Sequence, residues 1–161
     1  MIIDRTKIST RKATVNDIET LIEYRLIFLK ETYGIPPPEK EVCLKKSLMD
    51  YFTRSMKNNS FISWIAEYDN KSIGFSGMVI REQPGNFEIP NGRTGYILNM
   101  FTVKDFRKNG IGSILFQKLI EDAKKRNLDK IELHATHDGE HIYRQYDFKE
   151  PHDKALEIIL K

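Results

Sequence analysis

The chain has 161 residues, of which 40% are hydrophobic and 30% are charged, and its formal net charge is +3. A chain of this length builds one hydrophobic core of ordinary size, so we expect a single domain over residues 1–161. The mean hydropathy is -0.49 and no apolar run approaches the ~18 residues of a membrane helix, so we expect a soluble, cytoplasmic protein without a membrane partner. Acidic and basic residues are interleaved, and the lack of a broad basic face argues against nucleic acid as a partner.

Two further features bear on the compartment. Asp4, Arg5 and Lys7 interrupt the N-terminal segment, which therefore lacks the apolar core of a signal peptide. The one cysteine, Cys43, lies within a helical pattern and has no partner for an intramolecular disulfide. We expect a reducing compartment and a packing role for this thiol.

The first part of the chain predicts a strand and two helices. Residues 8–12 fit a strand, and Thr14 with Asp17 resembles a capping box that starts a helix, with Asp in place of the usual Glu or Gln. Gly34, which precedes a run of prolines, ends that helix. Its apolar residues recur at helical spacing: Ile18, Leu21, Ile22, Leu26, Leu29 and Tyr33. A second amphipathic helix, ending near residues 58–59, is indicated by Leu44, Leu48, Phe52 and Met56.

The rest of the chain predicts a sheet with further helices. Residues 60–68 and 72–81 are rich in aromatic and β-branched side chains and indicate a hairpin. Residues 94–103 are apolar almost throughout, which is typical of a central strand. A third helix begins at Ile111, and its apolar face predicts packing against the sheet. The remaining predictions are a strand over 130–136, a short helix over 138–146 and a last strand over 155–160.

These elements follow the order β-α-α-β-β-β-α-β-α-β. The fold class is therefore α/β, in the broad sense that includes α+β, with helices flanking the sheet. The hairpin makes an all-parallel sheet implausible, since it places antiparallel neighbours in it.

A turn between the central strand and the third helix has the sequence FRKNGIGS, residues 106–113. The first main-chain N–H groups of a helix have no partner within the helix, and they attract anions. Gly110 and Gly112 allow a large ligand to approach the main chain, and Arg107 favours phosphate charge. A pyrophosphate fits this pattern, although the glycines can also serve only to turn the chain.

A dinucleotide-binding fold is the other phosphate-binding interpretation of this turn. Glu132 lies near the offset of a ribose-binding acid. However, Leu115 occupies the third glycine position, the glycines lie several residues beyond the strand, and the hairpin breaks a βαβ alternation. These three features argue against a dinucleotide.

The motif Arg107-x-x-Gly110-x-Gly112 after a buried strand resembles the acyl-CoA-binding signature of the GNAT N-acetyltransferase superfamily. The segment LHATHDGEHIYRQYDF, residues 133–148, resembles the next strand and the Tyr-x-x-x-Gly-Phe ending of that family. The order of the elements agrees as well, so the resemblance covers nearly the whole chain. It implies a GNAT-like mixed, mostly antiparallel sheet and a direct, metal-free transfer from acetyl-CoA to a primary amine.

The resemblance also implies which residues hold acetyl-CoA. Main-chain N–H groups of the turn would cradle the pyrophosphate, and the end of the preceding strand would pair with the pantetheine arm. The turn residues are Arg107, Lys108, Asn109, Gly110, Ile111, Gly112 and Ser113, and the strand residues are Phe101, Thr102 and Val103. Thr136 stands where many relatives carry an Asn that holds the pantetheine, and Asp147 stands where the family usually has Gly.

Tyr143 matches the tyrosine that lies near the thioester sulfur in many relatives. A phenol, with a pKa of roughly 10, can protonate the departing thiolate, whose pKa is roughly 8.5. A main-chain N–H near Met100 or Phe101 could stabilise the oxyanion, as such donors do in acyl transfer. The competing interpretation makes Tyr143 a core aromatic whose hydroxyl bonds to the backbone.

Three side chains are candidates for the general base, besides a chain of waters: Glu67, His134 and Asp138. Periodicity does not choose among them. His134, His137 and His141 also suggest a metal site, but no carboxylate or thiolate spacing completes it, so we expect none.

Asn99 is a polar residue in an otherwise apolar strand, so its side chain should be hydrogen-bonded. It either faces the cleft or satisfies a neighbouring backbone group.

The acceptor is expected to be a small molecule or a peptide with a primary amine. Its identity should depend on the connections over residues 34–38 and 83–92, because loops vary most in such folds. A homodimer is expected only by analogy with relatives. The alternative to an enzyme is a non-catalytic CoA-binding module that acts through a protein partner.

Overall fold

The computed structural model describes residues 3–137 and 139–160, and its sheet has five strands in the order β1-β2-β3-β4-β5. The strands are β1 (Ser9–Lys12), β2 (Phe61–Tyr68), β3 (Lys71–Glu82), β4 (Arg93–Thr102) and β5 (Lys130–Leu133). The helices are α1 (Ile18–Tyr33), α2 (Pro38–Lys57), α3 (Ile111–Lys125) and α4 (Glu140–Arg144). Successive strands pair antiparallel except β4 and β5, which are parallel. The expected mixed, mostly antiparallel sheet is confirmed.

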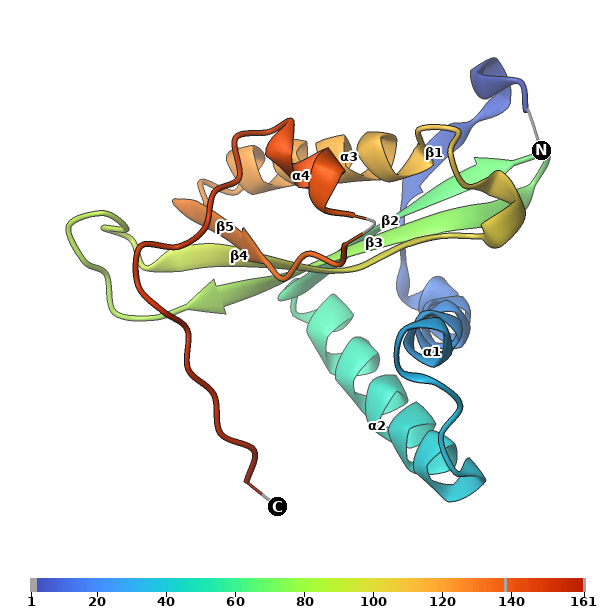
Figure 1. Ribbon diagram of the computed structural model, residues 1–161, viewed down its shortest axis with the longest axis horizontal. Helices are drawn as coiled ribbons and strands as arrows, with labels where there is room; N and C mark the ends of the chain where they lie inside the picture. The colour runs from blue at the N-terminus through green and yellow to red at the C-terminus, as the bar shows by residue number, and fades with distance from the viewer. Residues whose placement is uncertain (1–2, 138, 161) are drawn as a thin grey trace.

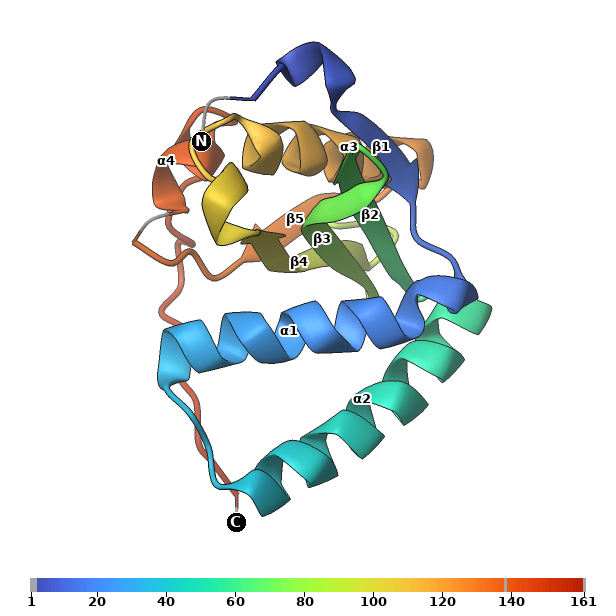
Figure 2. The same cartoon turned by 90° about the vertical axis from the view of Figure 1, so that its right-hand side faces the viewer.

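The sheet lies between two layers of helices (Figures 1 and 2): α3 and α4 cover one face, and α1 and α2 cover part of the other. Strand side chains point to the two faces alternately, so β2 supplies both layers. Phe61 and Ile65 pack with α1 and α2, whereas Ile62 packs with α3.

The predicted helices form where the apolar periodicity placed them. Thr14 and Asp17 make the expected capping box at the short 3-10 turn that leads into α1. Gly34, with φ +86°, ends α1, and Pro38 begins α2. Proline fits the first helical position because its missing N–H would have no partner there.

One predicted strand is wrong. Residues 155–160 form no strand, and the side chains of Leu156 and Ile158 are 94% and 80% exposed. Figure 1 shows this segment running below the sheet, away from β5. An apolar, β-prone sequence becomes a strand only when a neighbouring strand accepts its hydrogen bonds, and none of the described residues does so.

Three smaller expectations also change. The strand predicted over 130–136 ends at Leu133, and the short helix covers only Glu140–Arg144. The side chain of Cys43 is exposed on α2, so its expected packing role is wrong. It lies on the solvent side of a helix whose buried residues are Leu48, Phe52 and Ser55.

A buried carboxylate on α3 forms hydrogen bonds with strands β1 and β2. Asp122, which is 8% exposed, accepts a hydrogen bond from Trp64 Nε1 at 2.7 Å and another from Lys12 Nζ at 3.1 Å. A buried polar group without its partner costs about 1–3 kcal/mol. This contact therefore fixes how α3 lies across β1 and β2.

We expect Asp122→Ala to lower the free energy of unfolding by about 1–3 kcal/mol, because Trp64 loses its acceptor. Asp122→Asn keeps an acceptor and should lose less. Asp50→Ala on the exposed side of α2 should change the value by less than about 0.5 kcal/mol. Urea unfolding measures all three, and equal losses for Asp122→Ala and Asp50→Ala would contradict this role.

Candidate active site

The two parallel strands of the sheet separate partway along their length. β4 and β5 are paired from Thr94 opposite Lys130 to Ile97 opposite Leu133. Beyond this point β5 ends, whereas β4 continues to Thr102. Within the described residues, the edge of β4 over residues 98–102 therefore has no neighbouring strand on the β5 side.

An irregularity in β4 coincides with the separation. Against β3, Gly77 is opposite Leu98 but Phe75 is opposite Phe101, so β4 carries one extra residue. Such a bulge bends a strand and increases its twist. Asn99, with φ +57°, supplies the left-handed backbone at this point. Asparagine tolerates that conformation better than most residues.

The turn before α3 lies beyond the end of β4. Lys108 and Gly110 are both left-handed, with φ +64° and +81°. Alternation of left-handed residues in a turn directs successive N–H groups to one side and makes a concave anion site. The N–H groups of Lys108 and of residues 110–113 donate no hydrogen bond to any residue in the described part of the chain. Of the amides that the sequence predicted as a phosphate cradle, those of Lys108 and of residues 110–113 are therefore available, whereas the Arg107 N–H donates to the carbonyl oxygen of Lys104 at 3.2 Å.

Asn109 holds this turn in shape. Its side chain is 7% exposed, and Nδ2 donates to the carbonyl oxygens of Phe106 and Arg107, both at 3.1 Å. The sequence indicated only a main-chain role for Asn109. The structure adds that its amide side chain closes the turn from inside.

Arg107 does not direct its side chain along the turn. Its Nη2 lies 2.5 Å from Glu31 Oε2 on α1, and its Nε donates to the carbonyl oxygen of Thr102 at 2.9 Å. The guanidinium also lies over the ring of Phe101, 5.5 Å from its centroid. In this structure Arg107 joins α1 to the end of β4, and its predicted contact with phosphate stays a prediction.

A different arginine lies against the turn. The Arg5 guanidinium is 3.8 Å from the position that a Cβ on Gly110 would occupy. Arg5 is exposed and, among the described residues, forms no ion pair. No local pattern in the sequence indicates this proximity, because Arg5 and Gly110 are far apart along the chain.

The two glycines of the motif have different roles. Gly110 needs its left-handed φ, and space surrounds it apart from Arg5. Gly112 has ordinary helical backbone, but a Cβ there would lie only 3.1 Å from Cδ1 of Ile142. Gly112 therefore allows α3 and α4 to approach closely.

Tyr143 lies inside the α3 layer. It is 7% exposed, and its ring is 5.1 Å from Phe116 and 6.2 Å from Phe148, centroid to centroid. Burial raises the pKa of its phenol above 10. The hydroxyl makes no hydrogen bond with any residue that the structure describes, so the backbone bond of the competing interpretation is absent there.

Thr136 and Asp147 lie on either side of this tyrosine along the chain. A Cβ on Gly139 would be 3.3 Å from Thr136 Oγ1 and 3.5 Å from the Tyr143 hydroxyl, so both oxygens flank the same glycine. Asp147 has φ +62°, which is the conformation expected where relatives have Gly. Neither departure from the family pattern alters the turn before α3.

The three candidate bases occupy different places. Glu67 accepts a hydrogen bond from Arg11 at 2.9 Å on β2, two strands from the opening. His134 directly follows the last paired residue of β5, and its Nδ1 is 2.5 Å from the Tyr96 hydroxyl. Asp138 lies outside the described residues. Of the two described side chains, His134 is the one at the point where the strands separate.

The described part of the chain contains no group of three or more His, Cys, Asp or Glu side chains that could hold a metal ion. None of its helices is long and apolar enough to cross a membrane.

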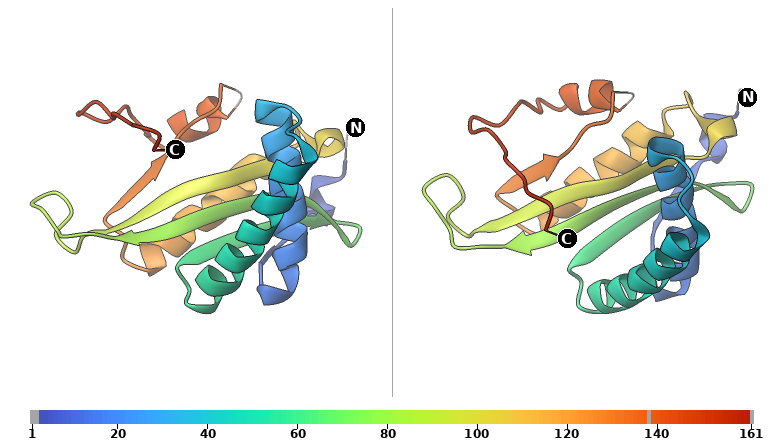
Figure 3. Two further views of the ribbon diagram at one scale, coloured as in Figure 1. Left: turned by 90° about the horizontal axis from the view of Figure 1, so that it is seen from below. Right: turned by 60° about the horizontal axis from the view of Figure 1, so that its bottom comes forward.

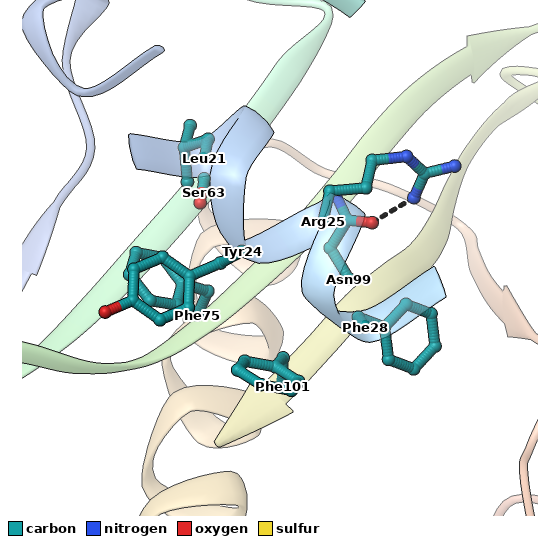
Figure 4. A pocket seen from close by; sticks show the side chains of 8 residues that line it. All are labelled: Leu21, Tyr24, Arg25, Phe28, Ser63, Phe75, Asn99 and Phe101. Carbon is teal, nitrogen blue, oxygen red and sulfur yellow. Dashed lines mark hydrogen bonds between the residues drawn. The ribbon is translucent and has the colours of Figure 1, made fainter. Parts of the chain in front are cut away.

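A hollow lies between α1 and the bulge of β4 (Figure 4). Tyr24, Phe28, Phe75 and Phe101 contribute aromatic side chains to it. Arg25 Nη1 donates a hydrogen bond to Asn99 Oδ1 across it. Asn99 thus faces the interior on the α1 side and bonds to a side chain instead of a neighbouring backbone group.

The two connections expected to set specificity lie apart. In the connection over residues 34–38, the first three residues border a second hollow, of about 320 Å³, between α1 and α2. The connection over residues 83–92 projects from the end of the sheet opposite the turn before α3 (Figure 3). Its role in acceptor choice stays a prediction.

The sequence matches the model of the acetyltransferase (GNAT) family over residues 29–148. Among solved structures, the chain is similar to a predicted acetyltransferase from Clostridium acetobutylicum, crystallised with acetyl-CoA. The identity is 34%, the match covers 94% of this chain and 96% of that one, and the TM-score is 0.85. It is also similar to a GCN5-related N-acetyltransferase from Ralstonia eutropha JMP134, at 20% identity, coverage of 94% and 98%, and a TM-score of 0.82. A search of curated proteins found no match.

The fold of this chain is thus shared with solved acetyltransferases. The chain belongs to the GNAT family of acetyltransferases. The resemblance found in the sequence is confirmed.

The packing role of Gly112 can be tested by measuring whether substitutions at Gly112 and Ile142 have additive effects on the free energy of unfolding. Ile142→Val removes the Cδ1 that a Cβ on Gly112 would meet. We expect Gly112→Ala to be more favourable by about 0.5–1 kcal/mol in the Ile142→Val background than in the wild type. Gly110→Ala should show no such coupling, since Ile142 does not border it. A double-mutant cycle of unfolding free energies measures this, and additive Gly112 and Ile142 values would refute it.

Proposed function

We propose that this chain transfers an acetyl group from acetyl-CoA to a primary amine of a small molecule or peptide by direct attack. One observation carries the proposal: free main-chain amides at the start of α3 and the unpaired edge of β4 border the same opening in the sheet. The relative at 34% identity was crystallised with acetyl-CoA, which supports the same ligand here.

The main chain would provide most of the binding. Amides of Lys108 and of residues 110–113 would receive the pyrophosphate, assisted by the dipole of α3, whose N-terminus has no side-chain cap. The end of β4, with Phe101, Thr102 and Val103, would pair with the amides of the pantetheine arm, and Thr136 would lie beside it. The N–H of Val103 already donates to the carbonyl oxygen of Ile73 at 2.9 Å, so the pairing would use the residues before it.

Acetyl-CoA supplies the thioester carbon to which the amine nitrogen bonds as the carbon–sulfur bond breaks. A main-chain N–H near Met100 or Phe101 would stabilise the carbonyl oxygen as negative charge develops. Tyr143 would donate its proton to the departing sulfur. His134, or a water beside it, would accept the proton that the amine loses.

The environment of Tyr143 limits when this proton moves. Burial raises the pKa of its phenol above the ordinary value of a tyrosine, which already exceeds that of a thiol, so transfer of the proton to the sulfur is uphill. The phenol therefore stays protonated until the carbon–sulfur bond breaks. Tyr143 would donate its proton as the carbon–sulfur bond breaks. The proton that the amine loses would then return to Tyr143 and regenerate the phenol.

Tyr143→Phe should lower kcat about 100-fold, with acetyl-CoA affinity changed less than about threefold, because the ring and its packing remain. The matched control is Tyr146→Phe, which removes a hydroxyl from the same short segment and should leave kcat unchanged. Since the pKa of Tyr143 is raised, the wild-type rate should not lose its acid below about pH 10. Steady-state assays of thiol release and binding calorimetry provide these values.

The same assays separate the enzyme from a CoA-binding module. Absence of transfer by the wild type to a broad amine panel, with acetyl-CoA still bound, would favour the module. Equal effects of Tyr143→Phe and Tyr146→Phe would remove the assignment of the acid.

Arg5→Gln should weaken acetyl-CoA binding about three- to tenfold at low ionic strength, because a charge near the phosphates is lost. The difference should shrink as salt increases. Arg54→Gln removes an exposed arginine from α2, on the other side of the sheet, and should have no effect. Unchanged binding by Arg5→Gln at every salt concentration would exclude a phosphate contact.

A further inference from the structure

The hollow between α1 and β4 holds the positive charge of Arg25. The side chain of Arg25 is half-buried, and among the described residues its one hydrogen-bond acceptor is the neutral amide oxygen of Asn99. No carboxylate of the described residues forms an ion pair with it. Glu31 of α1 is paired with Arg107, and Glu41 of α2 is paired with Lys30 of α1.

Keeping this charge away from water has a cost. Burial lowers the pKa of Arg25, and the nearby phenols of Tyr51 and Tyr33 offset this only in part. An arginine buried for packing alone would normally be paired with a carboxylate. An unpaired one is better explained by an anion that comes from outside the chain.

The geometry leaves part of the guanidinium free for such an anion. Figure 4 shows one terminal nitrogen on Asn99 and the other directed away from it and from the aromatic rings. Because Arg25 Nη1 donates a hydrogen bond to Asn99 Oδ1, the guanidinium is held in one orientation. A planar group fixed in this way can donate to carboxylate or phosphate oxygens from its remaining N–H groups.

This location is separate from the phosphate cradle. Asn99 lies three residues before the end of β4, or about 10 Å along an extended strand, and the cradle begins farther on. If acetyl-CoA occupies the opening as proposed above, its thioester end lies toward the bulge and its phosphates toward α3. An anion at Arg25 would then belong to the acceptor.

We propose that Arg25 binds a negatively charged oxyacid group, a carboxylate or a phosphate, on the amine that is acetylated. The acceptor is an anionic amine, and Arg25 and Asn99 select it. This inference rests on the proposed acetyl transfer, and its experiment has one arm that needs no turnover.

The first arm compares matched acceptors. Amino acids are paired with their carboxamides, and O-phosphoethanolamine is paired with ethanolamine, and kcat/KM is measured from thiol release. The wild type should prefer the charged member of at least one pair by tenfold or more, and the pair that responds identifies carboxylate or phosphate. Arg25→Gln should remove that preference while the neutral member changes less than threefold. Arg25→Lys should keep part of it, and Arg54→Gln should keep all of it.

The second arm measures equilibrium binding to the CoA-loaded protein. N-acetylglycine is compared with N-acetylglycinamide, and N-acetylated phosphoethanolamine with N-acetylethanolamine, by calorimetry. One charged ligand should bind at least tenfold more tightly than its neutral partner in the wild type, and Arg25→Gln should abolish the difference. Urea unfolding of Arg25→Gln shows whether α1 is still in place.

The outcomes separate the two proposals. If no amine is acetylated but the charged ligand is still preferred through Arg25, acetyl transfer fails and the anion site stands. If acetyl transfer occurs without preference for charge in either arm, the anion site fails and the enzyme stands. Equal losses for charged and neutral acceptors in Arg25→Gln would reduce Arg25 to a contact between α1 and β4.

Discussion

The separation of β4 from β5 is the constraint on which the candidate site depends. A strand edge inside a protein must satisfy its N–H and C=O groups, and β4 loses its partner on one side after Ile97. The extra residue at Asn99 bends β4 at the same point, so the strands cannot close again. The free amides before α3 lie at the far end of this stretch. A strand edge without a neighbouring strand in the described part of the chain and a set of free amides therefore meet in one opening, which suits a long ligand with amides and phosphates.

Helix α1 lies beside this opening and makes two contacts that involve arginine, one with a charged partner and one with a neutral partner. Arg107 and Glu31 neutralise one another at the surface, where both side chains are about 40% exposed. Such pairs contribute roughly 0–1 kcal/mol, so this one orients α1 more than it stabilises the fold. Arg25 donates to the neutral amide oxygen of Asn99 in a less exposed place, and no carboxylate of the described residues forms an ion pair with it. In the contact between Arg107 and Glu31 both charges are neutralised. In the contact between Arg25 and Asn99 the guanidinium can still bind an anion.

The sequence predicted those parts of the fold that depend on local pattern. Periodicity placed α1, α2 and α3, and the glycine-bearing turn indicated free amides. Properties that depend on contacts between residues far apart in the sequence could not be predicted. Glu31 precedes Arg107 by 76 positions, so the direction of the Arg107 side chain could not be read from its neighbours. The segment over 155–160 has a strand-like sequence, but only the packed fold determines whether an adjacent edge is available.

Tyr143 can be a packed core residue and still be placed to act as an acid. Its ring packs against Phe116 and Phe148, as expected of a core residue, and this packing fixes where the hydroxyl lies. Asp147 adopts the left-handed backbone that a glycine would supply, and the N–H of Phe148 returns to the carbonyl of Tyr143 at 3.4 Å. A proton donor that acts only during bond cleavage needs a fixed position and a protonated ground state. Burial provides both, because it immobilises the ring and raises the pKa of the phenol. Core packing is therefore the means by which this tyrosine could act as an acid.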